Sequence, residues 1–293
     1  MGDPTSPPVF FKNHRRTSGA NARSLFSYCH FYCCIVRCDK VLTVLVCGDA
    51  QMFEKIKKKG FQVRVLHHAE AILKHDMPDA AEELETVLLN ISIPVEELVR
   101  GGGGEGLATQ RIRRSLSGTH EWRKHVFEIK KIVDGEEKES VSHQIDHVKA
   151  FPRGTIALEI EWNNKDPFYD RDLENFKRLH AEGAISIGGI ITRGKSLQDG
   201  LEQSFEEFAL KHDIHSVEKL LPYYDPTRRQ IGLYEKAVKS KGSFPKGWAH
   251  AFFHDKFGEA TTHWRKLEDR VNRGVGNPCP LLLIGVPKEV LTM

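Results

Sequence analysis

Three acidic residues near the middle of the chain have the types and spacing of a metal-dependent hydrolase. Asp146 precedes a short turn, and Glu159 and Glu161 follow within the apolar segment TIALEIEWN. Charged side chains seldom occur inside an apolar strand unless they are paired or bind a metal ion. Carboxylates are the ligands that suit a hard divalent cation such as Mg²⁺. We therefore expect Asp146 and Glu159 to form a Mg²⁺ site.

The alternation of side chains along this strand predicts which residues share the site. In an extended strand, successive side chains point to opposite faces. One face then carries Ile156, Leu158, Ile160 and Trp162, and the other carries Ala157, Glu159, Glu161 and Asn163. Lys165 falls on the acidic face as well. The simpler alternatives are an exposed edge strand for the two glutamates and a turn or cap role for Asp146.

Overall composition does not identify a partner. The chain has 293 residues, of which 28% are charged, and a net charge of +3 is too small to indicate nucleic-acid binding. Residues 107–131 do form a basic run with two acids, Glu121 and Glu128. Its basic members are Arg111, Arg113, Arg114, Arg123, Lys124, Lys130 and Lys131. A solvated helix face explains such a run, and it becomes a phosphate-contacting surface only if it lines the acidic site.

The N-terminal part of the chain differs from the rest. Residues 1–24 are rich in Pro, Ser, Asn, Arg and Gly and predict disorder, and five of the six cysteines lie between Cys29 and Cys47. This is no disulfide framework, so the sequence favours a reducing cytoplasm. Cys29, His30, Cys33 and Cys34 allow a zinc interpretation, but a second paired cluster is missing. Charged residues interrupt the apolar segment 25–47 and argue against a membrane span. We expect residues 1–50 to be a dispensable extension and residues 51–293 to be the functional domain.

The remaining elements indicate an α/β fold. Apolar strands are predicted over 155–163, 185–192 and 280–287, with a further strand at QVRVLHH. Amphipathic helices are predicted over 76–91, with Asp76 as N-cap, over 171–183 and over 263–274, and a helix–turn–helix over 200–240. The GGGGEG run at 101–106 is a loop without the Gly-Lys-Ser/Thr ending of a P-loop. This alternation of strands and helices predicts a central sheet flanked by helices.

Several segments together resemble the BglII-type restriction endonucleases, relatives of BamHI within the PD-(D/E)xK nuclease superfamily. The segments are LEIEWNN, RDLENFKRLH, IITRGKS, CPLLLIGVP and, more weakly, AEAIL and LETVLLNISIPV. The likeness covers most of residues 60–293. It implies a PD-(D/E)xK fold with a central mixed sheet and a Mg²⁺-dependent, type II endonuclease that cuts double-stranded DNA. It also implies a homodimer, a palindromic and GATC-centred target, and a functional pairing with a DNA methyltransferase.

The resemblance assigns roles to individual residues. Mg²⁺ would be coordinated by Asp146, Glu159 and the carbonyl of Ile160. Glu161 would orient or deprotonate the attacking water. Glu128, which we expect on the preceding helix, is a candidate additional acid. The DNA contacts it implies are Asn163 and Asn164 to bases, Lys165 to phosphate, and a loop containing Arg193, Lys195 and Ser196. Ordinary turn and surface chemistry would equally explain these polar residues.

Two departures from the superfamily pattern matter. Glu161 stands where the superfamily usually has lysine, and Ile145 stands where proline usually precedes the first acid. At the position of Glu161, BamHI-like members have an acid and BglII-like members have an amide. Glutamate here therefore points to the BamHI and BglII branch of the superfamily, and it argues against a water activated by lysine. Two other functions remain as alternatives. One is a repair or recombination nuclease of the same fold, and the other is a DNA-binding module with a decayed site. The complete set of Asp146, Glu159 and Glu161 counts against decay.

Overall fold

The computed structural model describes residues 35–38, 41–44, 52–100 and 105–293. The chain divides into two compact units, Met1–Ala50 and Gln51–Met293. In the first unit, strands β1 (Ile35–Cys38) and β2 (Val41–Val44) pair antiparallel. The expected disorder of residues 1–24 and the zinc interpretation of Cys29, Cys33 and Cys34 lie outside the described residues.

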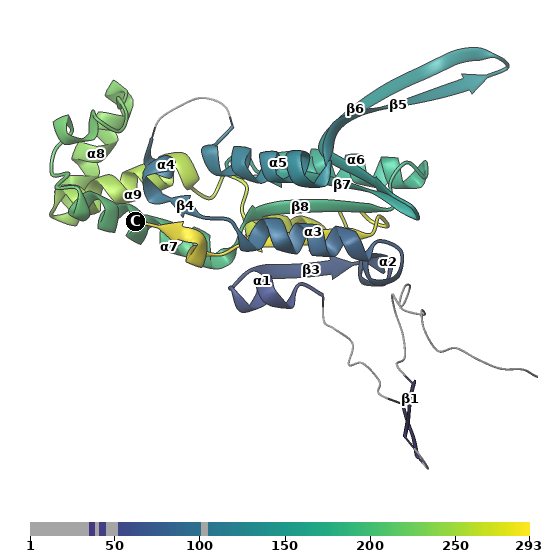
Figure 1. Cartoon of the computed structure of the whole chain (residues 1–293). Coiled ribbons are helices and arrows are strands. Elements are labelled where there is room, and N and C mark those ends of the chain that lie inside the picture. Colours follow the sequence, from purple (N-terminus) through teal and green to yellow (C-terminus); the bar gives the residue numbers. More distant parts are fainter. Residues whose placement is uncertain (1–34, 39–40, 45–51, 101–104) are drawn as a thin grey trace, which may run out of the picture. The chain divides into compact units, whose positions relative to one another are not determined.

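The second unit is built on a mixed sheet of six strands in the order β3-β9-β8-β7-β6-β5 (Figure 1). The strands are β3 (Gln62–Leu66), β5 (Arg123–Val133), β6 (Glu136–Phe151), β7 (Gly154–Glu161), β8 (Ile187–Arg193) and β9 (Leu281–Val286). Strands β7, β8 and β9 run parallel to one another, whereas β3, β6 and β5 each run antiparallel to a neighbour. The three strands predicted at 155–163, 185–192 and 280–287 are these central parallel strands, and the predicted mixed α/β architecture is confirmed.

Helices cover both faces of the sheet. They are α1 (Glu54–Lys58), α2 (Ala69–His75), α3 (Pro78–Leu89), α4 (Val95–Val99), α5 (Leu107–His120), α6 (Phe168–Ala181), α7 (Lys195–Lys211), α8 (Arg228–Lys241), α9 (Phe244–Phe257) and α10 (Trp264–Asn272). Two 3-10 turns, Glu218–Leu220 and Lys288–Val290, and a short parallel pair, β4 (Ile93–Pro94) with β10 (Leu291–Thr292), complete the unit. The predicted N-cap of α3 is wrong, because Asp76 ends α2 and Met77 precedes Pro78 at the start of α3.

The alternation predicted for β7 separates two hydrophobic cores. Ile156, Leu158, Ile160 and Trp162 all belong to the larger core, which includes residues of α3, α5, α7 and α9. Ala157 belongs to the smaller core, with Leu173, Phe176 and Leu179 of α6. Glu159 and Glu161 therefore project to the α6 side of the sheet, where they are covered rather than exposed to solvent.

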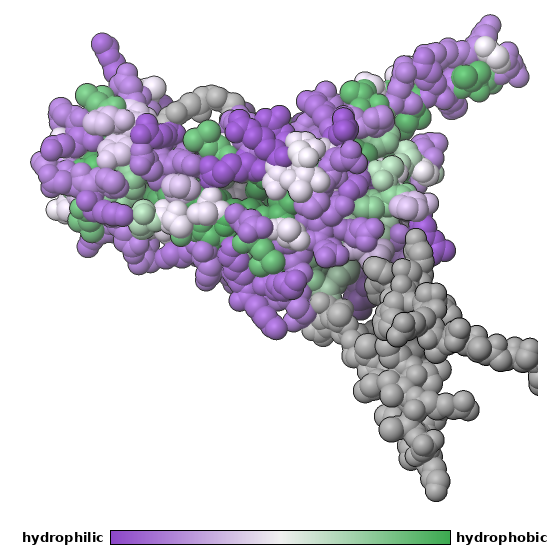
Figure 2. Space-filling model, viewed as in Figure 1, coloured by the Kyte–Doolittle hydropathy of each residue, from purple (hydrophilic) through white to green (hydrophobic). Residues whose placement is uncertain are grey.

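The basic run does not form one helix to residue 131. Helix α5 ends at His120, and residues 123–133 are strand β5, which forms a long hairpin with β6. The turn is Asp134–Gly135, with φ angles of 54° and 82°. An Asp-Gly pair with both residues left-handed matches the twist of a two-residue hairpin turn. The hairpin projects from the body of the unit (Figure 1), and its exposed apolar side chains include Val126, Ile132 and Val133. In Figure 2 small hydrophobic patches interrupt its mostly hydrophilic surface.

No helix among the described residues is long and apolar enough to span a membrane.

Candidate active site

The three acids of the motif meet at one end of strands β6 and β7. The pairing of His147 with Leu158 is the last that these antiparallel strands make at this end, so Asp146 and Glu159 are the next residues on either side. The backbone N–H of Asp146 donates a hydrogen bond to the Glu159 carboxylate. Glu161 follows two residues later on the same face. Asp146 is half exposed and lies 3.4 Å from the ammonium group of Lys124, whereas both glutamates are buried.

A fourth acid, Asp172 of α6, completes the group. It is 1% exposed, and Nη2 of Arg171 lies 2.7 Å from its Oδ1 atom. The same guanidinium lies 3.6 Å from Oε1 of Glu161. The side-chain amide of Asn164 donates a hydrogen bond of 2.6 Å to the other oxygen of Glu161. Glu161 is therefore held between two donors, with Asp172 as its acidic neighbour.

Burial and mutual repulsion control the ionisation of these acids. Burial, with further contributions from Asp172, Asp146 and Glu161, raises the pKa of Glu159 to about 9. Burial and the charge of Asp172 raise the pKa of Glu161 to about 8, although Asn164 and Arg171 oppose the shift. The pKa of Asp172 is raised as well, chiefly by burial. Clustered carboxylates with raised pKa values are characteristic of functional sites, because several negative charges in one place need a compensating cation or a proton.

The donor chemistry of these acids suits a divalent cation, although their carboxylates are not gathered within 4.8 Å of one another as a group of three. Asp146 and Glu159 offer carboxylate oxygens from adjacent strands, and such oxygens are the donors that Mg²⁺ prefers. Oδ2 of Asp172 is buried, and no donor among the described residues hydrogen-bonds to it. A cation, or a proton shared with Glu161, would satisfy this oxygen. A bound cation would also restore the ionised state of the buried glutamates.

Sequence reasoning missed Asp172, although a signal for it exists. Asp172 lies four residues before Phe176 and seven before Leu179, so it falls on the apolar stripe of α6. A charged residue on the inward stripe of an amphipathic helix is as unusual as one inside an apolar strand. The same criterion that selected Glu159 therefore selects Asp172.

A cleft of about 1120 Å³ includes Asp146 in its lining, whereas Glu159, Glu161 and Asp172 do not line it. Asp146, Ile160, Asn163 and Asn164 form part of its lining. Its basic lining residues are Arg100, Arg113, Arg123, Lys124 and Lys256. Three members of the basic run thus share this cleft with one of the acids, Asp146, so the condition under which we expected phosphate contacts is met for that residue. Arg111 and Arg114 of the same helix do not line the cleft; Arg111 pairs with Glu97 at 2.8 Å.

The predicted base-reading residues lie at the mouth of this site. Asn163 lines the cleft, and its Oδ1 atom is buried without a hydrogen-bond donor among the described residues. Asn164 uses its side chain to hold Glu161, and its backbone exchanges hydrogen bonds with Thr262. Lys165 is exposed and forms an isolated β-bridge with Thr261.

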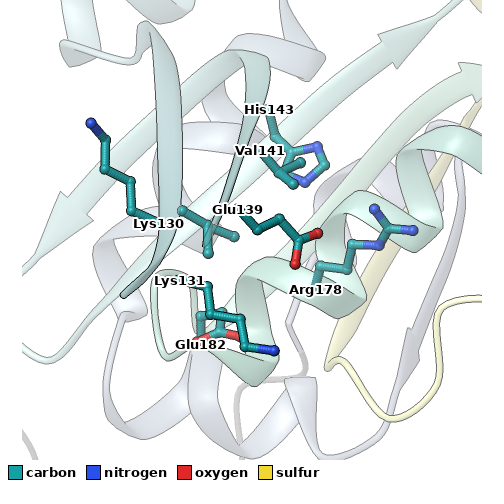
Figure 3. Close-up of a pocket in the computed structure, with 8 residues that line it drawn as sticks. Lys130, Lys131, Glu139, Val141, His143, Arg178 and Glu182 are labelled. Atoms are coloured by element: carbon teal, nitrogen blue, oxygen red, sulfur yellow. The ribbon is translucent and has the colours of Figure 1, made fainter. Parts of the chain in front are cut away.

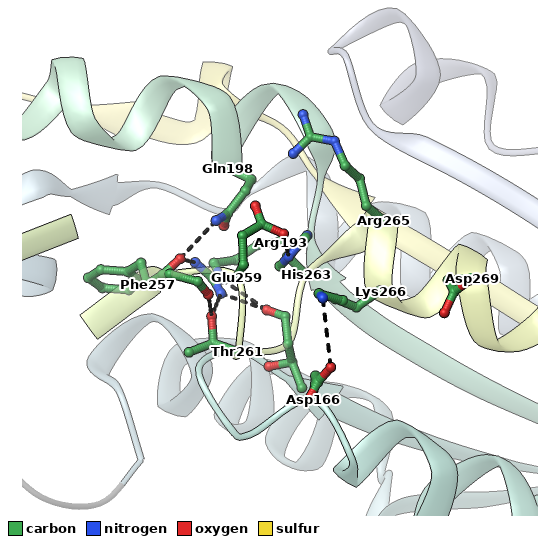
Figure 4. Close-up of polar contacts among 12 residues, drawn as sticks. Asp166, Arg193, Gln198, Phe257, Glu259, Thr261, His263, Arg265, Lys266 and Asp269 are labelled. Atoms are coloured by element: carbon green, nitrogen blue, oxygen red, sulfur yellow. Dashed lines mark hydrogen bonds and ion pairs between the residues drawn. The ribbon is translucent and has the colours of Figure 1, made fainter. Parts of the chain in front are cut away.

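Arg193 lies inside the protein and not on the exposed loop that the DNA-reading prediction requires. The side chain is fully buried, and its guanidinium donates to the carbonyl of Thr262 at 2.7 and 3.2 Å and to Oγ1 of Thr261 at 2.6 Å (Figure 4). It also stacks over the ring of Phe257 at 5.2 Å. Because Thr262 in turn pairs with Asn164, Arg193 supports the segment that positions Glu161.

Three further predicted residues are exposed. Lys195 and Ser196 lie at the start of α7, shortly after Thr192, which pairs with Glu161, and the backbone N–H of Lys195 donates to the side-chain oxygen of Gln62. Glu128 is on exposed strand β5 and not on a helix. It pairs with Ser142, four residues or about 13 Å along β6 from Asp146.

A second pocket, of about 590 Å³, lies between the hairpin and α6 (Figure 3). Its charged lining residues are Lys130, Lys131, Arg178, Glu139 and Glu182. The larger cleft has a similar mixture of signs, because Glu97, Glu105 and Asp146 line it beside its five basic residues, but only that cleft includes one of the motif's acids.

A mixed sheet with clustered acids at a strand end, beside a basic cleft, defines a nuclease of the restriction-endonuclease-like fold. The family model described as restriction endonuclease BglII/BglIII matches residues 61–286, and the chain belongs to this family. It is therefore a type II site-specific deoxyribonuclease that binds and cleaves double-stranded DNA. The resemblance found in the sequence is confirmed. No curated protein matches the chain significantly.

Proposed function

We propose that the chain hydrolyses DNA phosphodiester bonds in a Mg²⁺-dependent reaction at the cluster of Asp146, Glu159, Glu161 and Asp172. The observation that carries the proposal is the set of four neighbouring carboxylates, two of them with pKa values of about 8 and 9, of which Asp146 lines a cleft with five basic residues. Asp146, Glu159 and the carbonyl of Ile160 would hold the cation. When bound, the cation supplies Lewis-acid activation of the phosphodiester and of the attacking water.

Glu161 is the proposed base of the reaction. A base works best when its pKa lies near the operating pH, and burial beside Asp172 brings Glu161 into this range. Asn164 and Arg171 fix the carboxylate in place, so that it can accept the proton of the attacking water without first reorienting. Asp172 is a positioning residue, because it acts through Glu161 and Arg171.

The basic cleft is the proposed DNA surface. Arg113, Arg123 and Lys124 would contact phosphates and set the register of the duplex, and Lys165 would add a phosphate contact. Asn163 is the proposed base-reading residue, because a side-chain amide can pair with adenine in the major groove and its Oδ1 atom lacks a donor among the described residues.

The target and the assembly follow from the family likeness. We propose a homodimer whose two sites cut the two strands of a palindromic, GATC-centred sequence, since a two-fold symmetric protein matches a two-fold symmetric target. The enzyme would work in the cytoplasm alongside a DNA methyltransferase that protects the host's copies of the target. Residues 51–293 would form the nuclease domain, and residues 1–50 a dispensable extension, so that their removal should leave cleavage intact.

Incubation of the purified protein with plasmid and Mg²⁺, followed by sequencing of the fragment ends, tests the proposal. Identical ends at a palindrome support a restriction endonuclease. Random ends would favour a repair or recombination nuclease, and intact plasmid would favour a non-catalytic DNA-binding module. A single strand cut at each site would argue against the dimer.

A further inference from the structure

We propose a transition-metal site, for Zn²⁺ or a similar ion, formed by Glu202, His250 and His254 on helices α7 and α9. It is independent of the nuclease site. Nδ1 of His250 lies 3.0 Å from one oxygen of Glu202, and Nε2 of His254 lies 3.9 Å from the other. One ligand atom from each of the three residues lies within 4.8 Å of the other two. Among the residues that the structure describes, this is the one group of three or more His, Cys, Asp or Glu residues found with ligand atoms this close together, since the nuclease acids are more widely spaced.

The spacing of these atoms suits tetrahedral coordination. Metal–ligand distances of about 2.0–2.1 Å place neighbouring ligand atoms about 3.3 Å apart. The two observed separations, 3.0 and 3.9 Å, lie on either side of this value and involve the two oxygens of the Glu202 carboxylate. Small side-chain rotations would therefore bring the three atoms around one ion. Three protein ligands leave one of four positions for water.

The two helices hold the ligands in place. His250 and His254 are four residues apart on α9 and so share one face, with their rings 4.4 Å apart. Beneath them, Phe252 of α9 packs edge-to-face on Phe205 of α7 at 5.0 Å, and both rings are buried. The aromatic core thus fixes the distance between the helices, and the ligands above it need little ordering when an ion binds.

The donor set determines which ion would bind. Two imidazoles and one carboxylate suit Zn²⁺, Ni²⁺ or Cu²⁺, whereas Mg²⁺ requires oxygen ligands. The side chains are between one third and just over half exposed, so an ion can enter from solvent. The protein would then carry two chemically distinct sites, one of oxygen ligands for catalysis and one of nitrogen ligands that joins α7 to α9.

Hydrogen exchange followed by mass spectrometry tests this site on the full chain, after removal of metal with EDTA and dialysis. Zinc, titrated over the micromolar range, should slow amide exchange in peptides from 195–211 and 244–257, and Mg²⁺ should not. When the free zinc concentration is a hundred times the dissociation constant, amide exchange that requires the site to open should slow about 100-fold. The local readout separates this site from zinc bound by the N-terminal cysteines or by the nuclease acids.

His250→Gln and His254→Gln should each abolish this protection. His215→Gln is the matched control, because His215 lies 3.5 Å from Asp213 but belongs to no group of three ligands found among the described residues. Absence of zinc protection in the wild-type protein would overturn the proposal, and so would equal protection in all three variants. If a variant fails to fold, the proposal is still tested by the difference between zinc and Mg²⁺ in their protection of the wild-type protein from exchange. Because none of these readouts involves cleavage, failure here leaves the proposed nuclease mechanism unaffected.

Discussion

Replacement of Glu159 by glutamine should stabilise the metal-free protein while it abolishes cleavage. Glu159 is 6% exposed, and its pKa of about 9 means that the folded protein keeps it protonated at pH 7. In the unfolded chain the group has an ordinary pKa of 4.5 and is ionised. The folded state therefore binds the extra proton, so stability is greatest below pH 4.5 and falls as the pH rises toward 9.

The size of the effect follows from these two pKa values. Protonation of the group at pH 7 costs about 1.36 kcal/mol for each unit between 4.5 and 7, or about 3 kcal/mol. Glutamine avoids this cost, because it is neutral and its amide oxygen can still accept the hydrogen bond from Asp146. At pH 5 the same calculation gives less than about 1 kcal/mol. For a domain of this size, about 3 kcal/mol corresponds to roughly 6–12 °C in melting temperature.

Denaturant unfolding in EDTA, at pH 5 and pH 7, measures the difference. Glu235→Gln on exposed α8 is the control, and it should change stability little at either pH. A Glu159→Gln protein that is no more stable than wild type at pH 7 would refute the reasoning. A gain of equal size at both pH values would refute it as well, since the effect would then not arise from ionisation.

Three further predictions concern Asp172, the basic residues of the cleft and the buried Arg193. Asp172→Asn should lower the pKa of Glu161 by removal of a nearby negative charge, so the acid limb of the pH–rate profile for single-turnover cleavage should move to lower pH; an unchanged limb would contradict the role of Asp172. Arg113→Ala should weaken binding to all DNA sequences alike, and it should reduce the slope of log affinity against log salt concentration by about 1. The side chain of Arg114 does not line the cleft, so Arg114→Ala should leave the affinity and this slope unchanged in a filter-binding assay. Arg193→Met should destabilise the fold by about 3 kcal/mol in urea unfolding, because the carbonyl of Thr262 and the hydroxyl of Thr261 lose a buried charged donor; a loss of DNA affinity without loss of stability would restore the DNA-reading interpretation.

The parts of the fold with strong local periodicity were predictable from sequence. Strands β7, β8 and β9 are apolar runs bounded by turn residues, and α6 has an apolar stripe at helical spacing. The alternation of side chains along β7 predicts that Glu159 and Glu161 share one face, and the two cores on either side of the sheet confirm it.

The hairpin was missed for a physical reason. Its strands are mostly exposed, so their pattern of charged and β-branched residues lacks the clear alternation of a half-buried strand. The Asp134–Gly135 turn was the local signal, and it identifies a hairpin when both residues take left-handed angles.

Arg193 shows what sequence cannot supply. A basic residue at a strand end before Gly194 has the composition of a ligand-binding loop, but its burial depends on the segment Thr261–Thr262, almost seventy residues away. Such long-range contacts leave no local pattern. Asp172 is the opposite case, since its place on the apolar stripe of α6 is visible in the sequence.

The most direct test of the account compares single-turnover DNA cleavage by wild type, Asp146→Asn and Glu159→Gln, with DNA binding measured in parallel in the presence of Ca²⁺. We predict binding within a few-fold of wild type and cleavage slower by about a thousandfold or more, because several kcal/mol of transition-state stabilisation depend on the cation that these residues hold. Cleavage by either variant at a rate within tenfold of wild type, with the same fragment ends, would contradict the assignment of the active site.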